Sequence, residues 1–163
     1  MFTKRCVPIN QAVKDFGSHG FRATMVHRNL AWMQKLDVEY DASCFDVDPF
    51  QAMPGGFGGP WPFIAGKFVG LPYTLPQDHT LLVTLGESTP RIWIEKFAYL
   101  RSLLGMALLI THPDYLDTPS RLDVDRRYLE YLAEQQDVWH AMPVDVAKWW
   151  RQRDVLEIVD GGE

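Results

Sequence analysis

The chain has 163 residues, the length of one ordinary domain, and 47% of them are hydrophobic, which is enough for a packed core. Its formal net charge of −5 gives no electrostatic basis for binding DNA, RNA or an anionic membrane. The apolar runs are far shorter than the ~20 residues that span a bilayer, and the N-terminal sequence lacks the apolar core of a secretory signal. We therefore expect a single cytoplasmic domain over residues 1–163 with a frayed tail at 154–163. Cys6 and Cys44 lack metal-type spacing and are expected as reduced thiols.

Hydrophobic periodicity and glycine or proline punctuation predict helices that alternate with strands along the chain. The expected helices cover residues 11–16, 27–36, 90–104, 123–136 and 144–153. The expected strands cover residues 21–23, 38–42, 68–75, 106–110 and 138–142. Strands that alternate with helices over short connections indicate an α/β fold with a parallel sheet.

A long loop, residues 46–66, connects the second and third expected strands and holds four prolines and five glycines. A loop of this length in a compact domain is typically a binding loop or a lid. Its aromatic side chains suit that role, and they equally suit simple coverage of the open end of the sheet. We expect ligand contacts from Trp61 and Phe63 in this loop, and from His79 beyond the third strand.

Polar residues follow the expected strands, at the ends where α/β proteins gather their catalytic side chains. Arg22 follows the first strand, Asp41 ends the second, and the PQDH segment at 76–79 follows the third. His112 follows the apolar run 106–110, which we expect to form a strand buried on both faces. A histidine held by a carboxylate is an acid or base with a fixed tautomer, and a neighbouring arginine holds negative charge. Each residue alone also fits a structural role, but together they predict a shared cleft.

Four segments occur in a characteristic order: GFRAT at 20–24, YDASCFD at 40–46, LPYTLPQDHTL at 71–81 and LLITHPDYL at 108–116. In this order and spacing they resemble the C-terminal half of polysaccharide deacetylases of the NodB-homology type, carbohydrate esterase family 4. The resemblance runs from about residue 15 to residue 153 and covers most of the chain. It implies a distorted seven-stranded (β/α) barrel, of which this chain holds the C-terminal strands and helices. It also implies removal of acetyl groups from N-acetylated sugars with a divalent metal, usually zinc.

The resemblance further implies roles for individual residues. Arg22 corresponds to the arginine that orients the catalytic base, and Asp41 to the aspartate that holds the catalytic histidine. His112 corresponds to the general acid that protonates the leaving amine. Asp46 is an alternative to Asp41 for the second role, and Thr24 stands where the family has a proline.

Two motifs of the family have no counterpart in this sequence: the T-F-D-D strand end that supplies the base and a metal ligand, and the H-x-x-x-H pair. His19 and His27 are eight residues apart, across an expected strand, so they do not share a helix turn. A catalytic zinc needs about three protein ligands. We therefore expect no metal ligands in this chain, and zinc only where a missing N-terminal half is supplied. A replacement metal site built from His19, His27 and His79 is the alternative.

Three functional hypotheses follow. The first is the C-terminal part of a deacetylase, inactive alone, which acts on a carbohydrate together with a companion chain or a second copy that covers its missing strands. The second is a non-catalytic carbohydrate-binding or regulatory remnant that uses loop 46–66 to hold sugar. The third is a related C–N hydrolase with rearranged metal ligands. We favour the first.

Overall fold

The computed structural model describes residues 2–24, 28–47 and 56–157. The chain divides into two compact units, each with a hydrophobic core of its own, where the sequence predicted one domain. Unit 1 comprises Met1–Ser43, Pro62–Leu71 and Ala141–Glu163, and unit 2 comprises Cys44–Trp61 and Pro72–His140. Within the described ranges, no helix is both long enough and apolar enough to cross a membrane.

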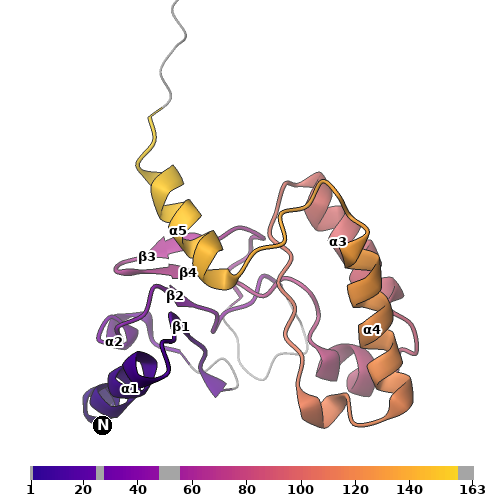
Figure 1. Ribbon diagram of the computed structural model, residues 1–163, viewed down its shortest axis with the longest axis horizontal. Helices are drawn as coiled ribbons and strands as arrows, with labels where there is room; N and C mark the ends of the chain where they lie inside the picture. The colour runs from indigo at the N-terminus through magenta and orange to yellow at the C-terminus, as the bar shows by residue number, and fades with distance from the viewer. Residues whose placement is uncertain (1, 25–27, 48–55, 158–163) are drawn as a thin grey trace, which may run out of the picture. The chain divides into compact units, whose positions relative to one another are not determined.

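Four short strands form the sheet of unit 1, in the order β1-β2-β4-β3 (Figure 1). They cover Gly20–Phe21 (β1), Tyr40–Asp41 (β2), Phe63–Ala65 (β3) and Phe68–Gly70 (β4). β2 pairs in parallel with both β1 and β4, whereas β3 and β4 form an antiparallel pair. The sheet is therefore mixed, and the partial (β/α) barrel that the resemblance implies stays a prediction.

Two glycines allow aromatic rings to lie across this sheet. Gly20 is the register partner of Tyr40, and a Cβ atom on Gly20 would be 2.0 Å from Cζ of Tyr40. In the same way, a Cβ atom on Gly70 would be 2.2 Å from Cζ of its partner Phe63. A side chain at either position would displace the ring, so the packing of β1 on β2 and of β3 on β4 depends on these glycines.

Three helices complete unit 1: α1 (Phe2–Asp15), α2 (Leu30–Met33) and α5 (Pro143–Asp154). Helix α1 starts well before the expected residue 11 and runs through Pro8, although a proline inside a helix costs ~3 kcal/mol. Packing offsets that cost, because Cys6 of α1 is buried in one cluster with Met33. Helix α5 confirms the prediction for 144–153 and packs against β2 and β4 (Figure 1).

Unit 2 is built around α3 (Arg91–Ser102) and α4 (Pro119–Ala133), which confirm the helices expected at 90–104 and 123–136. Helix α4 begins earlier than expected because the Thr118 side chain caps it and Pro119 occupies its first turn. The ring of Trp93 on α3 lies 5.2 Å from that of Tyr128 on α4, and both side chains are fully buried. Two short helical turns, the π-helix η2 (His79–Thr84) and the 3₁₀-helix η3 (Pro113–Tyr115), complete unit 2.

The strand expected at 106–110 is not formed, nor is the one expected at 138–142. The 106–110 segment lies beside Thr74, whose Oγ1 accepts from the backbone N–H of Leu108 at 3.0 Å and donates to the carbonyl of Met106 at 2.7 Å. The Leu108 carbonyl also accepts the backbone N–H groups of Thr74 at 3.0 Å and Leu75 at 3.2 Å, so both backbone and side-chain bonds hold the segment, although it forms no strand ladder. Residues 108–110 are only half-buried, so the prediction of a strand buried on both faces is wrong.

Candidate functional site

Asp78 and His112 form a hydrogen-bonded pair in unit 2. Nδ1 of His112 lies 2.8 Å from Oδ1 of Asp78, which is fully buried, while the His112 side chain is 31% exposed. A carboxylate only accepts hydrogen bonds, so Nδ1 carries the proton of the neutral ring. This fixes the tautomer and leaves Nε2, which has no partner among the described residues, to exchange a proton with a ligand.

The backbone on both sides of the pair holds the Asp78 carboxylate in place. Oδ1 accepts the N–H of His79 at 2.8 Å, and Oδ2 accepts the N–H of His112 itself. Asp78 thereby caps η2, whose first residue is His79, while η3 begins directly after His112. Because three donors converge on one buried carboxylate, the orientation of the imidazole is tied to the backbone of two separate turns.

Tyr115 packs against both imidazole rings of this region. Its ring centroid lies 5.4 Å from that of His112, at an interplanar angle of 70°, and 4.8 Å from that of His79, at 60°. Edge-to-face contacts of this kind restrict how a ring can tilt. The structure therefore places His79 beside His112, with Tyr115 touching both rings.

Asp125, on α4, adds a second carboxylate to the surroundings of Asp78. Burial and the negative charge of Asp78 raise the pKa of Asp125. Asp125 has no hydrogen-bond or ion-pair partner within the part of the chain that the structure describes. The surroundings of the Asp78 carboxylate therefore include a second acidic side chain.

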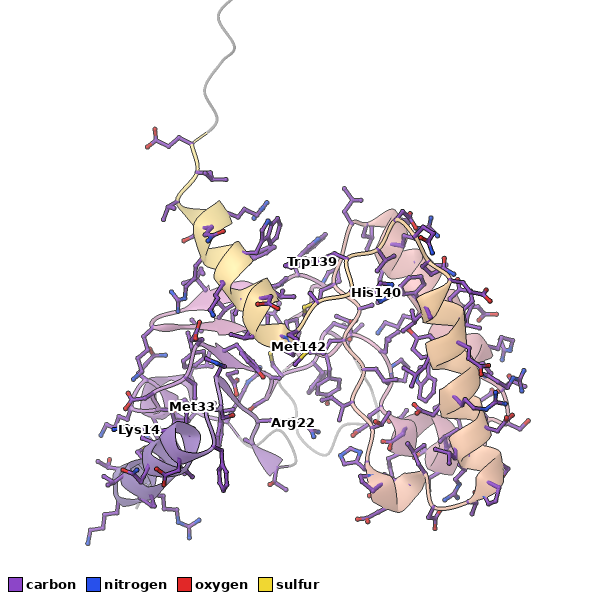
Figure 2. The ribbon with its side chains drawn as sticks, viewed as in Figure 1. Lys14, Arg22, Met33, Trp139, His140 and Met142 are labelled. Carbon is purple, nitrogen blue, oxygen red and sulfur yellow. The ribbon has the colours of Figure 1, made fainter. Side chains whose placement is uncertain are left out.

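Arg22 and Asp41 lie in unit 1. Arg22 follows β1 and is exposed (Figure 2), whereas Asp41 ends β2 and is buried. Oδ1 of Asp41 accepts a hydrogen bond from the Ser43 hydroxyl at 2.5 Å. Burial raises the pKa of Asp41, and the hydrogen bonds from Ser43 and the charge of Arg28 act in the opposite direction. The structure thus pairs His112 with Asp78 rather than with Asp41, the residue that the resemblance implied.

The other residues predicted for the site are divided between the units. Asp46, the alternative to Asp41, forms an ion pair in unit 2 with Lys96, at 2.8 Å from Oδ2 to Nζ. Trp61 is a partly exposed residue of unit 2, whereas Phe63 belongs to β3 of unit 1 and covers Gly70. Part of loop 46–66, residues 48–55, lies outside the described residues, as does the end of the expected frayed tail, 158–163.

The residues present do not fit the zinc site that the resemblance implies. Among residues 2–24, 28–47 and 56–157, no group of three or more His, Cys, Asp or Glu side chains is arranged to hold a metal ion. His19 lies in unit 1, where its Nδ1 is 2.8 Å from Glu39, His79 lies in unit 2, and His27 is outside the described residues. We therefore assign no step in this chain to a metal.

Sequence reasoning missed the role of Asp78, although it placed the PQDH segment among the polar residues at strand ends. Nothing in the spacing of the motifs pairs residue 78 with residue 112, and the role of Tyr115 has no sequence signal at all. No protein-family model matches the chain, and neither a curated protein nor a solved structure does so.

Proposed function

We propose that unit 2 supplies the general acid of an N-deacetylase that acts on an N-acetylated sugar, with His112 as the proton donor. One observation carries the proposal: a buried carboxylate, Asp78, holds one ring nitrogen of His112, while the other nitrogen has no partner among the described residues and the side chain reaches solvent. Cleavage of an amide requires a proton on the leaving nitrogen, because an amide anion is too basic to leave. Nε2 of His112 is placed to deliver that proton.

The surrounding groups have positioning roles in this proposal. Asp78 fixes the tautomer, and its bonds to the backbone N–H groups of His79 and His112 keep the ring from rotating. Tyr115 packs against the imidazole and limits its tilt. His112 acts in this step as the imidazolium, with protons on both ring nitrogens, and donation from Nε2 leaves the neutral ring with its proton on Nδ1. The proton that the attacking water loses returns to Nε2 through solvent, which regenerates the acid.

The remaining machinery is proposed to come from a companion chain. The sequence has no T-F-D-D and no H-x-x-x-H segment, so the base that activates water and the metal ligands are assigned to that chain. The carbohydrate substrate would then be held between the two. We place the reaction in the cytoplasm, because Cys6 and Cys44 are both buried free thiols, as is usual in a reducing compartment.

The accessibility and orientation of Nε2 are tested first on the chain alone. An oriented, accessible imidazole attacks an activated ester such as p-nitrophenyl acetate without a metal. We expect the His112→Ala variant to lose most of the ester hydrolysis of the chain, because among the histidines that the structure describes only His112 has its ring bonded to a buried carboxylate. His140→Ala is the matched control, since His140 is exposed and also belongs to unit 2. Equal rates for the two variants would contradict the proposal.

The deacetylase activity is tested by coexpressing the chain with the coding sequence upstream of Met1 and measuring acetate release from triacetylchitotriose. We expect the His112→Ala variant to lose activity by about 10²- to 10⁴-fold, the usual contribution of a positioned general acid. Asp78→Asn should lose less, because the ring remains but its tautomer is no longer enforced. Unchanged acetate release from His112→Ala would remove this residue from the mechanism.

A further inference from the structure

The charge of the chain is distributed unevenly along the sequence. Residues 1–36 hold six of the 16 Lys and Arg residues and one of the 21 Asp and Glu residues, so this segment has a formal net charge of +5 within a chain of −5. The whole segment belongs to unit 1. The net charge of the chain therefore conceals a basic region, which gives unit 1 an electrostatic basis for binding an anionic surface.

Ion pairing separates the cations of this region from those of unit 2. Each of the six Lys and Arg side chains of unit 2 forms an ion pair with an Asp or Glu of the same unit. Four exposed cations on or beside α1, by contrast, have no carboxylate partner among the described residues: Lys4, Arg5, Lys14 and Lys35. Their positive charge is available to a ligand.

One face of α1 carries two of these cations. Four exposed side chains at spacings of three, four and three residues lie along one side of the helix: Lys4, Val7, Gln11 and Lys14. Lys35 lies beside this face, because its ammonium is 2.8 Å from Oγ1 of Thr3. The acid of the segment, Asp15, accepts a hydrogen bond from the Gln11 side chain at 2.7 Å and leaves the cations uncompensated.

Two of the cations occupy an unfavourable end of the helix. Lys4 and Arg5 lie in the first turn of α1, which contains no acidic residue. The helix dipole places partial positive charge at this end, so cations there weaken the helix. Helix α5 of the same unit has the favourable arrangement, with Asp145 in its first turn and Arg151 and Arg153 in its last. The first-turn cations of α1 thus do not stabilise their helix, and an anion at its surface would relieve their repulsion.

Large apolar side chains near these cations are open to solvent. Val7 is 71% exposed, one turn after Lys4, and Phe16, directly after the helix, is 85% exposed. Trp32 of α2 is 57% exposed, and its ring centroid lies 5.9 Å from that of Phe2 on α1. Cations beside tryptophan and other apolar side chains are typical of protein surfaces that lie in the headgroup region of a bilayer.

We propose that α1 and the adjoining α2 form a surface that binds an anionic lipid bilayer. The cations contact the charged headgroups, while Val7, Phe16 and Trp32 enter the headgroup region. A bilayer fits better than another polyanion, because a nucleic acid or an acidic peptide would neutralise the cations and leave Val7 and Phe16 in water. This inference goes beyond the proposed function and does not depend on His112, which lies in unit 2.

The test uses the full chain and vesicles that differ in charge: phosphatidylcholine alone, and an equimolar mixture of phosphatidylcholine and phosphatidylserine. Sedimentation of the vesicles measures the bound fraction of the protein. We expect binding to the mixed vesicles and none to phosphatidylcholine alone. Raising the salt from about 0.1 M to about 1 M shortens the Debye length from ~10 Å to ~3 Å and should abolish most of the binding.

Two double variants with the same change in net charge locate the binding surface. Lys4→Gln combined with Lys14→Gln should weaken binding about 25-fold, from ~1 kcal/mol per cation near an anionic membrane. Arg91→Gln combined with Arg127→Gln removes two paired cations of unit 2 and should bind as the wild type does. Val7→Ser retains every charge and should weaken binding about three- to tenfold, because an apolar contact is lost. Circular dichroism melts confirm that each variant is folded.

Several results would contradict the proposal. Equal binding to both kinds of vesicle, equal losses in the two double variants, or full binding by the variant at Lys4 and Lys14 would overturn it. Binding of polyuridylate without binding of the mixed vesicles would overturn it in favour of a nucleic acid. Unchanged binding in Val7→Ser would overturn the role given to the apolar side chains. The ester hydrolysis assigned to His112 is measured on the same variants and should be the same in all of them, so each proposal can fail without the other.

Discussion

Asp41 in unit 1 and Asp78 in unit 2 are both buried aspartates, but Asp78 holds a histidine whereas Asp41 holds a serine. Asp41 is 1% exposed and accepts from Ser43, which is itself fully buried. Asp78 is 0% exposed and accepts from His112, whose side chain reaches solvent. A buried carboxylate can therefore assist a reaction only when the side chain that it hydrogen-bonds is exposed to solvent and can reach a ligand.

The hydrogen-bond networks of Asp41 and Asp78 differ in the group that completes them. In unit 1 the Ser43 hydroxyl donates to Asp41 and accepts the N–H of Ala23 at 2.7 Å, so the network joins the segments that follow β1 and β2 and closes inside. In unit 2 the backbone N–H groups use part of the Asp78 carboxylate, and the remaining bond goes to a titratable ring. The first network stabilises the fold, and the second also orients the partly exposed ring of His112.

The largest effect is expected at Asp78. Asp78→Ala removes the acceptor for three donors, and we expect the free energy of unfolding to fall by about 3 kcal/mol or more. Urea unfolding followed by the fluorescence of Trp93 and its neighbours measures the loss. Asp78→Asn retains one acceptor oxygen and should lose less. A change below about 1 kcal/mol in the alanine variant would show that the network does not hold these turns.

A smaller loss of stability is expected at Ser43, whose buried hydroxyl bonds to Asp41 and to the Ala23 N–H. Ser43→Ala removes the hydroxyl that links Asp41 to the Ala23 N–H, and we expect destabilisation of about 2 kcal/mol. Ser102→Ala is the control, because the exposed Ser102 hydroxyl bonds only to the Tyr99 carbonyl three residues earlier. Ester hydrolysis by His112 should be the same in both variants. If Ser43→Ala also abolished hydrolysis, the assignment of separate roles to the two aspartates would fail.

The charge of Asp41 makes a further contribution that depends on pH. Burial raises its pKa, so the folded chain holds the Asp41 proton more tightly than the unfolded chain does. The stability that this protonation contributes is present below the ordinary aspartate pKa of about 3.9 and is lost as the pH rises through the folded-state pKa. We expect the wild type to lose stability relative to Asp41→Asn as the pH rises above about 3.9. An unfolding series that showed the opposite slope would mean that Ser43 and Arg28 outweigh burial.

The smallest effect on stability is expected at Tyr128, which also carries a buried polar group. Its hydroxyl has no hydrogen-bond partner in the described part of the chain, and burial raises its pKa. Tyr128→Phe removes an unsatisfied hydroxyl and retains the ring that packs on Trp93, so stability should be unchanged or higher by about 1 kcal/mol. Tyr128→Leu, which loses the ring, should be destabilised. A thermal melt distinguishes these results, and a clear loss in Tyr128→Phe would reveal a partner for the hydroxyl.

Helices α3, α4 and α5 could be predicted from the sequence to within a few residues, because their determinants are local. Apolar spacing defines the buried face of each helix, and Pro90 marks where α3 begins. The expected start of α4 at residue 123 missed its first turn, which begins at Pro119. The strand at 106–110 could not be judged in this way, because an apolar run does not reveal how its backbone pairs. Here the Leu108 carbonyl accepts the N–H groups of Thr74 and Leu75, and the Thr74 side chain bonds to Leu108 and Met106, without a strand ladder.

The same division applies to the candidate site. The sequence analysis selected His112 and the PQDH segment as polar residues at strand ends, although among the described residues no strand directly precedes either of them. The catalytic role of His112 stays a prediction. It could not choose between Asp41 and Asp78, because both follow apolar segments and have the same side chain. Asp78 is 34 residues from His112 in the chain, and a contact across that separation depends on how η2 and η3 meet. Residue type and local pattern decided which groups could do chemistry, whereas long-range packing decided which carboxylate holds the histidine.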